Sequence, residues 1–196
     1  MIRKRIDTMQ KDTYQRLMNY FEHHPRLVSV LRISNALITK AIYLAYPCLL
    51  IYLALWNPTT KLFDPAGTWT QLVSNPLHAP LIAAFVIPAL GFVLLSIFRK
   101  RYNAPRPYEV FETPSALKKT TKGKSFPSRH VFSIFVIGTT FIYVCPLESI
   151  GIAILCLGVI LAIIRVIGGI HFTKDVLVGA LCGILVGILG FSLFGY

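Results

Sequence analysis

Long apolar runs constrain this chain more than any other feature of its sequence. Five of them can form helices that cross a hydrocarbon layer about 30 Å thick, and they lie at about Ile33–Trp56, His78–Phe98, Val131–Val144 extended toward Pro127, Ile150–Ile167 and Val176–Phe194. The third run is short, and it is included mainly because reactive residues begin at its polar end. Only 14% of the residues are charged, whereas soluble domains carry about 25%. We therefore predict an all-α, integral membrane helical bundle of about five transmembrane helices.

The N-terminal segment is polar and cationic, unlike the rest of the chain. Its apolar residues recur at roughly helical spacing among basic ones, namely Met9, Tyr14, Leu17, Met18, Phe21 and Leu27. This pattern predicts an amphipathic helix on the membrane surface, or alternatively a solvated helix that packs on the domain. Pro25 is expected to break or kink it. We divide the chain into this cationic segment, residues 1–32, and a membrane-embedded domain, residues 33–196.

The net charge of +12 comes from 20 Lys and Arg residues against 8 Asp and Glu. In a soluble protein such an excess would suggest nucleic acid as a partner. Here the cations lie in a few polar segments between apolar runs, which favours anionic lipid headgroups or a phosphate substrate. We therefore expect membrane lipids as partners and no nucleic acid, whereas the sequence leaves the oligomeric state open.

Alternating crossings place three polar segments on one face of the membrane: the N-terminal segment, Arg99–Phe126 and Gly168–Lys174. Three dense patterns lie in or beside these segments. They are Arg99-Lys100 followed by Arg106-Pro107, then Pro127-Ser128-Arg129-His130, and last Arg165-x5-His171-x3-Asp175. Ionisable groups beside hydrocarbon are expensive, so clusters of them are functional candidates.

The residue types in these patterns suit phosphate chemistry. Guanidinium groups bind phosphate oxygens in a bidentate manner, and a serine that opens a helix adds a hydroxyl and backbone N–H donors. The candidate phosphate-binding residues are Arg99, Lys100, Arg106, Ser128, Arg129 and Arg165. His130 and His171 carry imidazoles that can act as nucleophile, acid or base near neutral pH. Asp175 lies one helical turn after His171 and can orient that imidazole.

At these residues the chain resembles the type 2 phosphatidic acid phosphatases, which share an active-site design with the vanadium-dependent haloperoxidases. That family shows Lys-x6-Arg-Pro, then Pro-Ser-Gly-His, then Ser-Arg-x5-His-x3-Asp. Arg106-Pro107, Pro127-Ser128 with His130, and Arg165 with His171 and Asp175 match at the same spacing.

Four departures from the family pattern stand out. Arg99 occupies the position of the leading lysine, with Lys100 one residue away, so either side chain is a candidate for that position. Arg129 replaces a glycine, and Ile164 replaces a serine. Six spans are usual in the family, whereas we count five.

The resemblance implies a membrane lipid phosphate phosphatase that needs no cofactor or metal. His171 would attack phosphorus with Asp175 orienting it, and His130 would protonate the leaving group and then activate water. The substrate would be a lipid with a terminal phosphate, such as phosphatidic acid, phosphatidylglycerol phosphate or a polyprenyl pyrophosphate. The alternatives are a non-catalytic anion-binding membrane protein or small transporter, and a metal-dependent hydrolase with His130, His171 and Asp175 as ligands.

Two lines of reasoning disagree on which side of the membrane the active site faces. The family usually places its site on the extracytoplasmic face. The cations of this chain gather on the face that carries the three patterns, and cytoplasmic loops are enriched in Lys and Arg. We therefore expect the site to face the cytoplasm, in a bacterial cell membrane.

Overall fold

A computed structural model describes residues 2–55 and 79–196, and every described element is a helix. In chain order they are α1 (Ile2–His23), α2 (Pro25–Leu55), α4 (Ala79–Tyr102), α5 (Pro107–Val110), α6 (Arg129–Val144), α7 (Glu148–Ile167) and α8 (Thr173–Leu193). The all-α prediction is confirmed. Trp56 and His78, where two of the expected spans end or begin, lie outside the described residues.

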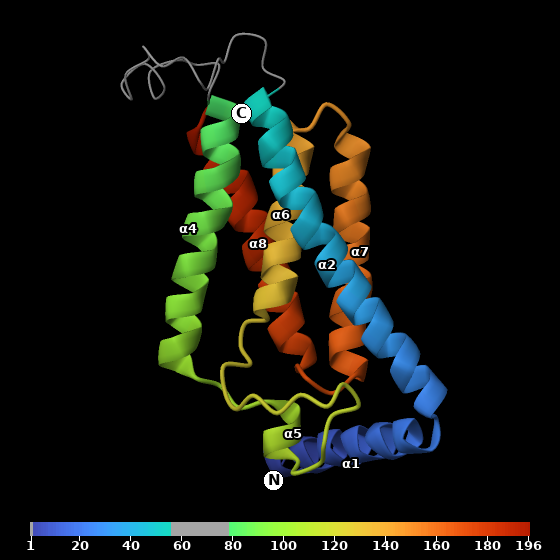
Figure 1. Ribbon diagram of the computed structural model, residues 1–196. Helices are drawn as coiled ribbons and strands as arrows, with labels where there is room; N and C mark the ends of the chain where they lie inside the picture. The colour runs from blue at the N-terminus through green and yellow to red at the C-terminus, as the bar shows by residue number, and fades with distance from the viewer. Residues whose placement is uncertain (1, 56–78) are drawn as a thin grey trace.

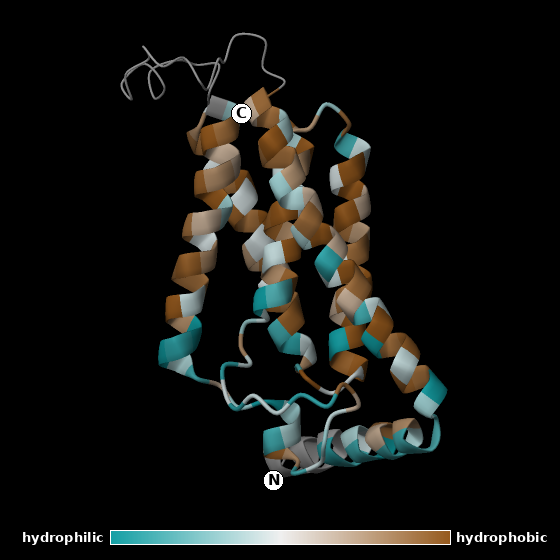
Figure 2. Ribbon diagram, viewed as in Figure 1, coloured by the Kyte–Doolittle hydropathy of each residue, from teal (hydrophilic) through white to brown (hydrophobic). Residues whose placement is uncertain are grey.

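Within the described ranges, four helices are long and apolar enough to cross a membrane: α2, α4, α7 and α8. Helix α6 is shorter and lies in the middle of the bundle, in contact with α2, α4, α7 and α8 (Figure 1). Its neighbours cover it, so nearly every residue in its first three turns is buried. Apolar residues dominate the bundle, and polar residues gather at one end and on α1 (Figure 2).

Helices α6 and α8 approach each other very closely because glycines face the contact. A Cβ atom on Gly179 would lie 2.7 Å from the carbonyl oxygen of Ser128, and one on Gly183 would lie 2.7 Å from that of Phe132. Small residues allow such close approach between membrane helices. The start of α6, which carries His130, is therefore pressed directly against the first turns of α8, which carry Asp175.

The first span begins earlier than predicted. Helix α2 starts at Pro25, not at Ile33, and runs without interruption past the boundary expected after residue 32. Proline is favoured at the first helical position because it has no N–H to leave unpaired, so Pro25 both ends α1 and starts α2. The predicted break at this proline is confirmed.

Helix α1 lies across the end of the bundle where the polar connections gather (Figure 1). Its side chains Tyr14, Met18 and Phe21 are buried in a cluster with Phe111, and the Tyr14 and Phe111 rings are 5.1 Å apart. The apolar side of α1 therefore packs on the domain, and its position on the membrane surface stays a prediction.

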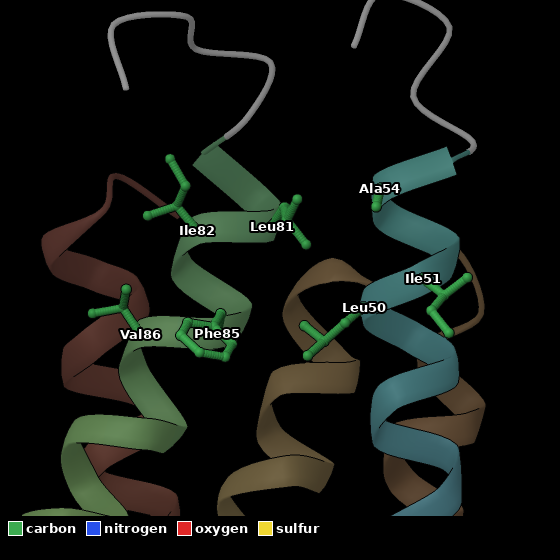
Figure 3. A pocket seen from close by; sticks show the side chains of 7 residues that line it. All are labelled: Leu50, Ile51, Ala54, Leu81, Ile82, Phe85 and Val86. Atoms are coloured by element: carbon green, nitrogen blue, oxygen red, sulfur yellow. The ribbon is translucent and has the colours of Figure 1, made fainter. Parts of the chain in front are cut away.

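The opposite end of the bundle holds an apolar pocket of about 440 Å³ between α2 and α4 (Figure 3). Its lining residues are Leu50, Ile51, Ala54, Leu81, Ile82, Phe85 and Val86. These side chains offer no group that could react with or bind a phosphate. The polar residues gather at the other end of the bundle, which α1 covers (Figure 2).

Candidate active site

Two connections meet beside α1 at one end of the bundle (Figure 1). The first joins α4 to α6 and contains α5, and the second joins α7 to α8. They are tied together by hydrogen bonds from Leu117 N to Gly168 O and from the Arg106 guanidinium to Ile170 O. The predicted gathering of the N-terminal segment and both polar connections on one face is confirmed.

His171 lies in the second connection and is buried with Asp175 and Ser125. Its Nδ1 atom is 3.5 Å from Oδ2 of Asp175 and 3.3 Å from Oγ of Ser125. The Ser125 hydroxyl donates to the same Oδ2 atom, and the backbone N–H of Phe172 donates to it at 3.1 Å. Both hydrogen bonds thus converge on Oδ2, the oxygen that faces Nδ1 of the imidazole, whereas Oδ1 has no partner among the described residues.

This network assigns the tautomer of His171. Because Asp175 accepts hydrogen bonds only, the imidazole proton belongs on Nδ1, and Nε2 is left with a free lone pair. Burial lowers the pKa of His171 to about 4, with the charges of Arg106 and Arg165 acting in the same direction and the hydrogen bond to Asp175 opposing them. The ring is therefore neutral near pH 7, as a nitrogen nucleophile has to be.

Arg106 is held in place by main-chain groups and by Glu109. Its Nε donates to Gly123 O at 3.0 Å, and its Nη1 lies 3.4 Å from Ile170 O. The Glu109 carboxylate accepts from the backbone N–H of Arg106 at 2.8 Å and from that of Gly123. Glu109 thus closes the turn that positions the guanidinium.

Arg165 is buried near the end of α7. Its backbone carbonyl accepts from the N–H groups of Ile170 and His171. Its side-chain Nε finds no hydrogen-bond partner in the described part of the chain. One residue therefore both fixes the turn that holds His171 and keeps a buried guanidinium donor free.

Positive charge is in excess at this site. Arg99, Arg106 and Arg165 are all buried, and among the described residues no salt bridge joins any of them to a carboxylate. Burying an unpaired cation costs several kcal/mol. An arrangement of this kind is suited to an anion with several oxygens, such as a phosphate.

Ser128 opens α6, as predicted, and is fully buried. Its backbone N–H donates to the carbonyl oxygen of Asp175 at 2.8 Å, which locks the start of α6 to the start of α8. Its hydroxyl has no partner in the described residues. The hydroxyl is therefore free to donate to a ligand oxygen at the positive end of a helix.

The three remaining predicted phosphate ligands contact backbone carbonyls or are exposed. The Arg99 guanidinium donates to the carbonyls of Lys124, Ser125 and Pro127, so it holds the loop that carries Ser125. Lys100 is exposed, which makes Arg99 the buried residue of that pair. Arg129 is also exposed, and its guanidinium lies 5.3 Å from the Phe92 ring centre. A phosphate-binding role for these three residues stays a prediction.

His130 opens into a cavity of about 350 Å³ that it shares with Arg165. Helix α2 lines the same cavity with Asn35, Thr39 and Lys40, and the first connection adds Lys119. The Ile170 residue beside His171 also lines it. Among the described residues, no group of three His, Cys, Asp or Glu side chains is arranged to hold a metal ion.

Sequence reasoning missed Ser125, Glu109 and the polar residues of α2. Ser125 lies two residues before Pro127 in a loop, where no periodicity singles it out. Glu109 lies three residues after Arg106, and an acidic residue at that distance is the sequence signature of a helix-capping pair. Lys40 lies within an apolar run, and only the fold brings it to the cavity that His130 lines.

Three comparisons with known proteins bear on this site. The family model of the PAP2 superfamily matches residues 80–196. The crystal structure of Aquifex aeolicus LpxE is similar with a TM-score of 0.63 and 22% identity, covering 92% of this chain and 93% of that one. A transmembrane PAP2 type phosphatidylglycerolphosphate phosphatase from Bacillus subtilis gives a TM-score of 0.44 and 20% identity, covering 92% and 94%. No curated protein matches in sequence.

Proposed function

Because this chain belongs to the PAP2 superfamily, we propose that it is a membrane phosphatase that removes the terminal phosphate of a lipid through a phosphohistidine at His171. The observation that carries the proposal is the neutral, buried imidazole of His171, held by Asp175 and Ser125 beside buried arginines that lack a carboxylate partner. The chain has the helical fold of the PAP2 membrane phosphatases.

In the first step, Nε2 of His171 attacks phosphorus and forms a P–N bond while the P–O bond to the lipid breaks. The positive charge that develops on the imidazole is stabilised by Asp175, which faces Nδ1 at 3.5 Å. Arg106, Arg165 and the Ser128 hydroxyl stabilise the equatorial phosphate oxygens. His130 donates a proton to the leaving oxygen, so the lipid departs as an alcohol or a phosphate monoester.

In the second step, the neutral His130 accepts a proton from a water molecule that attacks phosphorus from the side the lipid has left. The P–N bond breaks, inorganic phosphate is released, and the imidazole of His171 returns to its starting state with the proton on Nδ1. His130 thus serves as acid and then as base, which requires it to face the leaving-group side of phosphorus. Its position in the cavity shared with Arg165 supports this role.

The test uses p-nitrophenyl phosphate, whose leaving group departs without a proton. We expect His130→Asn to release about one equivalent of p-nitrophenolate per enzyme and then to turn over slowly, since hydrolysis of the phosphoenzyme still needs the base. His171→Ala should show neither the burst nor turnover. The matched control is His24→Ala, because His24 is exposed and lies outside the site.

Acid-labile, alkali-stable phosphate bound at position 171 in the His130→Asn protein would identify the intermediate. Near-normal turnover in His171→Ala would end the proposed mechanism. Orthovanadate should inhibit strongly, because a trigonal bipyramidal vanadate bonded to an imidazole resembles the transition state. Activity retained in excess EDTA separates this mechanism from metal-dependent hydrolysis.

We also propose that this site faces the cytoplasm. The support is the gathering of α1 and both polar connections at one end of the bundle, together with the general enrichment of Lys and Arg in cytoplasmic loops. A single cysteine at Thr120, which is exposed, can be probed in intact cells after the native cysteines are replaced. Thr120 is a better position than Ser115 in the same connection, because Ser115 is buried and unsuited to labelling. Modification of Thr120→Cys by a membrane-impermeant maleimide would place the site outside and refute the proposal.

A further inference from the structure

The cavity beside His130 has a polar wall that the mechanism above does not use. That wall consists of Asn35, Thr39 and Lys40 from α2 and Lys119 from the first connection. Asn35 and Thr39 are one helical turn apart, so their side chains project from the same face of α2. Polar residues on a membrane-spanning helix are costly unless they pair or face a cavity, which makes such residues functional candidates.

Two polar side-chain atoms of this wall have no hydrogen-bond partner in the described part of the chain. Oδ1 of Asn35 and Oγ1 of Thr39 are buried, and neither makes a hydrogen bond within the described residues. An unpaired buried polar group typically costs about 1–3 kcal/mol. The Nε atom of Arg165, which lines the same cavity, is in the same situation. Donors and acceptors on two helices thus face a common space that suits a polar ligand.

The reaction geometry decides which part of the substrate occupies this space. An in-line displacement places the leaving oxygen on the side of phosphorus opposite the attacking Nε2 of His171. His130, as the acid, has to meet that oxygen, and His130 lines the cavity together with the α2 residues. We therefore place the α2 residues and Lys119 on the leaving-group side of the cavity with His130, and Arg165 on the side of the phosphate that is transferred.

The charge of the wall indicates what kind of leaving group fits. Lys40 and Lys119 bring two ammonium groups to a cavity that also holds Arg165, and its lining residues include no carboxylate. A diacylglycerol leaving group is neutral and would leave both ammonium groups without an anion. A leaving group with its own phosphate would supply one.

We propose that Asn35, Thr39, Lys40 and Lys119 form a leaving-group subsite that favours lipids whose leaving group carries a phosphate of its own. This inference rests on the proposed function and names its substrate class. The second phosphate can belong to a diphosphate or to a phosphodiester such as the headgroup of phosphatidylglycerol phosphate. Both supply the same chemistry, an anionic phosphate oxygen within reach of Lys40 and Lys119.

The experiment compares three substrates in one detergent: farnesyl diphosphate, short-chain phosphatidylglycerol phosphate and short-chain phosphatidic acid. For Lys40→Gln combined with Lys119→Gln, we expect kcat/KM to fall about tenfold or more on at least one of the first two, as the loss of a charge-assisted hydrogen bond implies. On phosphatidic acid it should change less than about twofold. The substrate with the larger loss identifies the source of the second phosphate.

Two further variants test whether the effect belongs to the subsite. Lys122→Gln removes an exposed cation from the same connection, and it should leave all three rates within about twofold. Thr39→Val keeps the shape of the side chain and removes only the hydroxyl, so it should lower the diphosphate or phosphodiester rate selectively. Selective loss in either set of variants also shows that the protein is folded, because phosphatidic acid is still hydrolysed.

Equal losses on all three substrates would show general attraction of anions and overturn the subsite. Unchanged rates on all three would overturn it as well, and so would a wild-type enzyme that strongly prefers phosphatidic acid. None of these results touches the proposed function, which fails separately if His171→Ala retains activity.

Discussion

The polar residues of the candidate site fall into two groups, here called walls, whose atoms are satisfied in different ways, and the second group lines the cavity that His130 and Arg165 share. One wall, here called the connection wall, carries Arg106, Ser125 and His171, and each of these side chains is held by a backbone carbonyl or by Asp175. The other, the α2 wall, carries Asn35 and Thr39, whose buried oxygens have no partner among the described residues. The first wall is rigid before substrate arrives, and the second keeps its donors and acceptors free.

This difference suits the two halves of a phosphate ester. Groups that stabilise a transition state work best when they are already oriented, because no reorganisation is needed during the reaction. Groups that recognise the rest of a substrate need only be available. We therefore expect substitutions on the connection wall to lower kcat for every substrate, and substitutions on the α2 wall to change the preference among substrates.

The largest expected effect comes from Asp175→Asn. The amide cannot hold the proton of His171 on Nδ1 or stabilise the imidazole cation that forms, so kcat should fall on the order of 10³-fold. It should fall by the same factor for phosphatidic acid and for farnesyl diphosphate. The measurement is steady-state kinetics on both substrates in detergent. A loss confined to one substrate would contradict the division between the two walls.

Most of the fold could be predicted from the sequence, and so could most of the residues that gather at the candidate site, because both depend on local patterns. Apolar runs long enough to cross a membrane placed α4, α7 and α8. Motif spacing singled out Arg106 after α4, His130 at the start of α6, Arg165 near the end of α7, and His171 and Asp175 around the start of α8. The start of α2 was predicted wrongly. The helix begins before the apolar run, in a segment where Arg26 and Arg32 interrupt the apolar pattern.

The α2 wall could not be predicted in the same way. Asn35 and Thr39 are ordinary polar residues near one end of a span, and nothing in their spacing connects them to His130. Only tertiary packing brings helix α2 to the cavity that His130 and Arg165 share. Ser125 was missed for a related reason, since its partners His171 and Asp175 are 46 and 50 residues away.

Gly179→Ala tests how rigidly the start of α6 is held. The new Cβ would lie 2.7 Å from the backbone oxygen of Ser128, so the helices have to separate, at a cost of about 1–3 kcal/mol. Because Ser128 moves with the start of α6, kcat should fall as well, by more than tenfold. Thermal unfolding in detergent and kinetics are measured together.

The matched control is Gly187→Ala, where the Cβ would meet the Thr139 side chain at 2.5 Å, two turns further along α8. We expect a similar loss of stability and little change in kcat. If both variants lose activity equally, destabilisation alone explains the effect, and the start of α6 has no special role.

Ser125→Ala should have a smaller effect, about tenfold in kcat, because Asp175 keeps its hydrogen bond from the Phe172 N–H and its contact with His171. Ser133→Ala is the matched control. Ser133 is equally a buried serine, and its hydroxyl has no partner in the described residues, so its loss should leave kcat within about twofold. A silent Ser125→Ala would mean that Asp175 alone fixes the nucleophile.

The buried neutral state of His171 also predicts a pH dependence of stability. Its pKa is lowered to about 4, whereas an unfolded chain has a histidine pKa of about 6.5. Between these values the unfolded state binds more protons, so the contribution to stability is complete above about pH 6.5 and declines as the pH falls toward 4. The decline amounts to up to about 3 kcal/mol. His171→Asn should flatten the unfolding profile in this window, and an unchanged slope would contradict a neutral His171.

The smallest expected effect concerns the support behind the connection wall. The Tyr14 hydroxyl of α1 lies 3.2 Å from the carbonyl oxygens of both Gly169 and Thr113, one in each connection, and burial raises the pKa of this phenol. Gly169 has a positive φ of 75°, and a Cβ there would lie 2.8 Å from the same hydroxyl. Tyr14→Phe keeps the packing against Phe111 and removes only the hydrogen bonds, so it should cost about 1 kcal/mol of stability. Because Gly169 is two residues before His171, kcat should fall by a few fold on every substrate alike, with no change in preference.

Tyr20→Phe, on the exposed side of the same helix, should change neither stability nor kcat. A change in substrate preference in Tyr14→Phe would contradict this prediction, because it would show that α1 acts on the α2 wall and not on the connection wall.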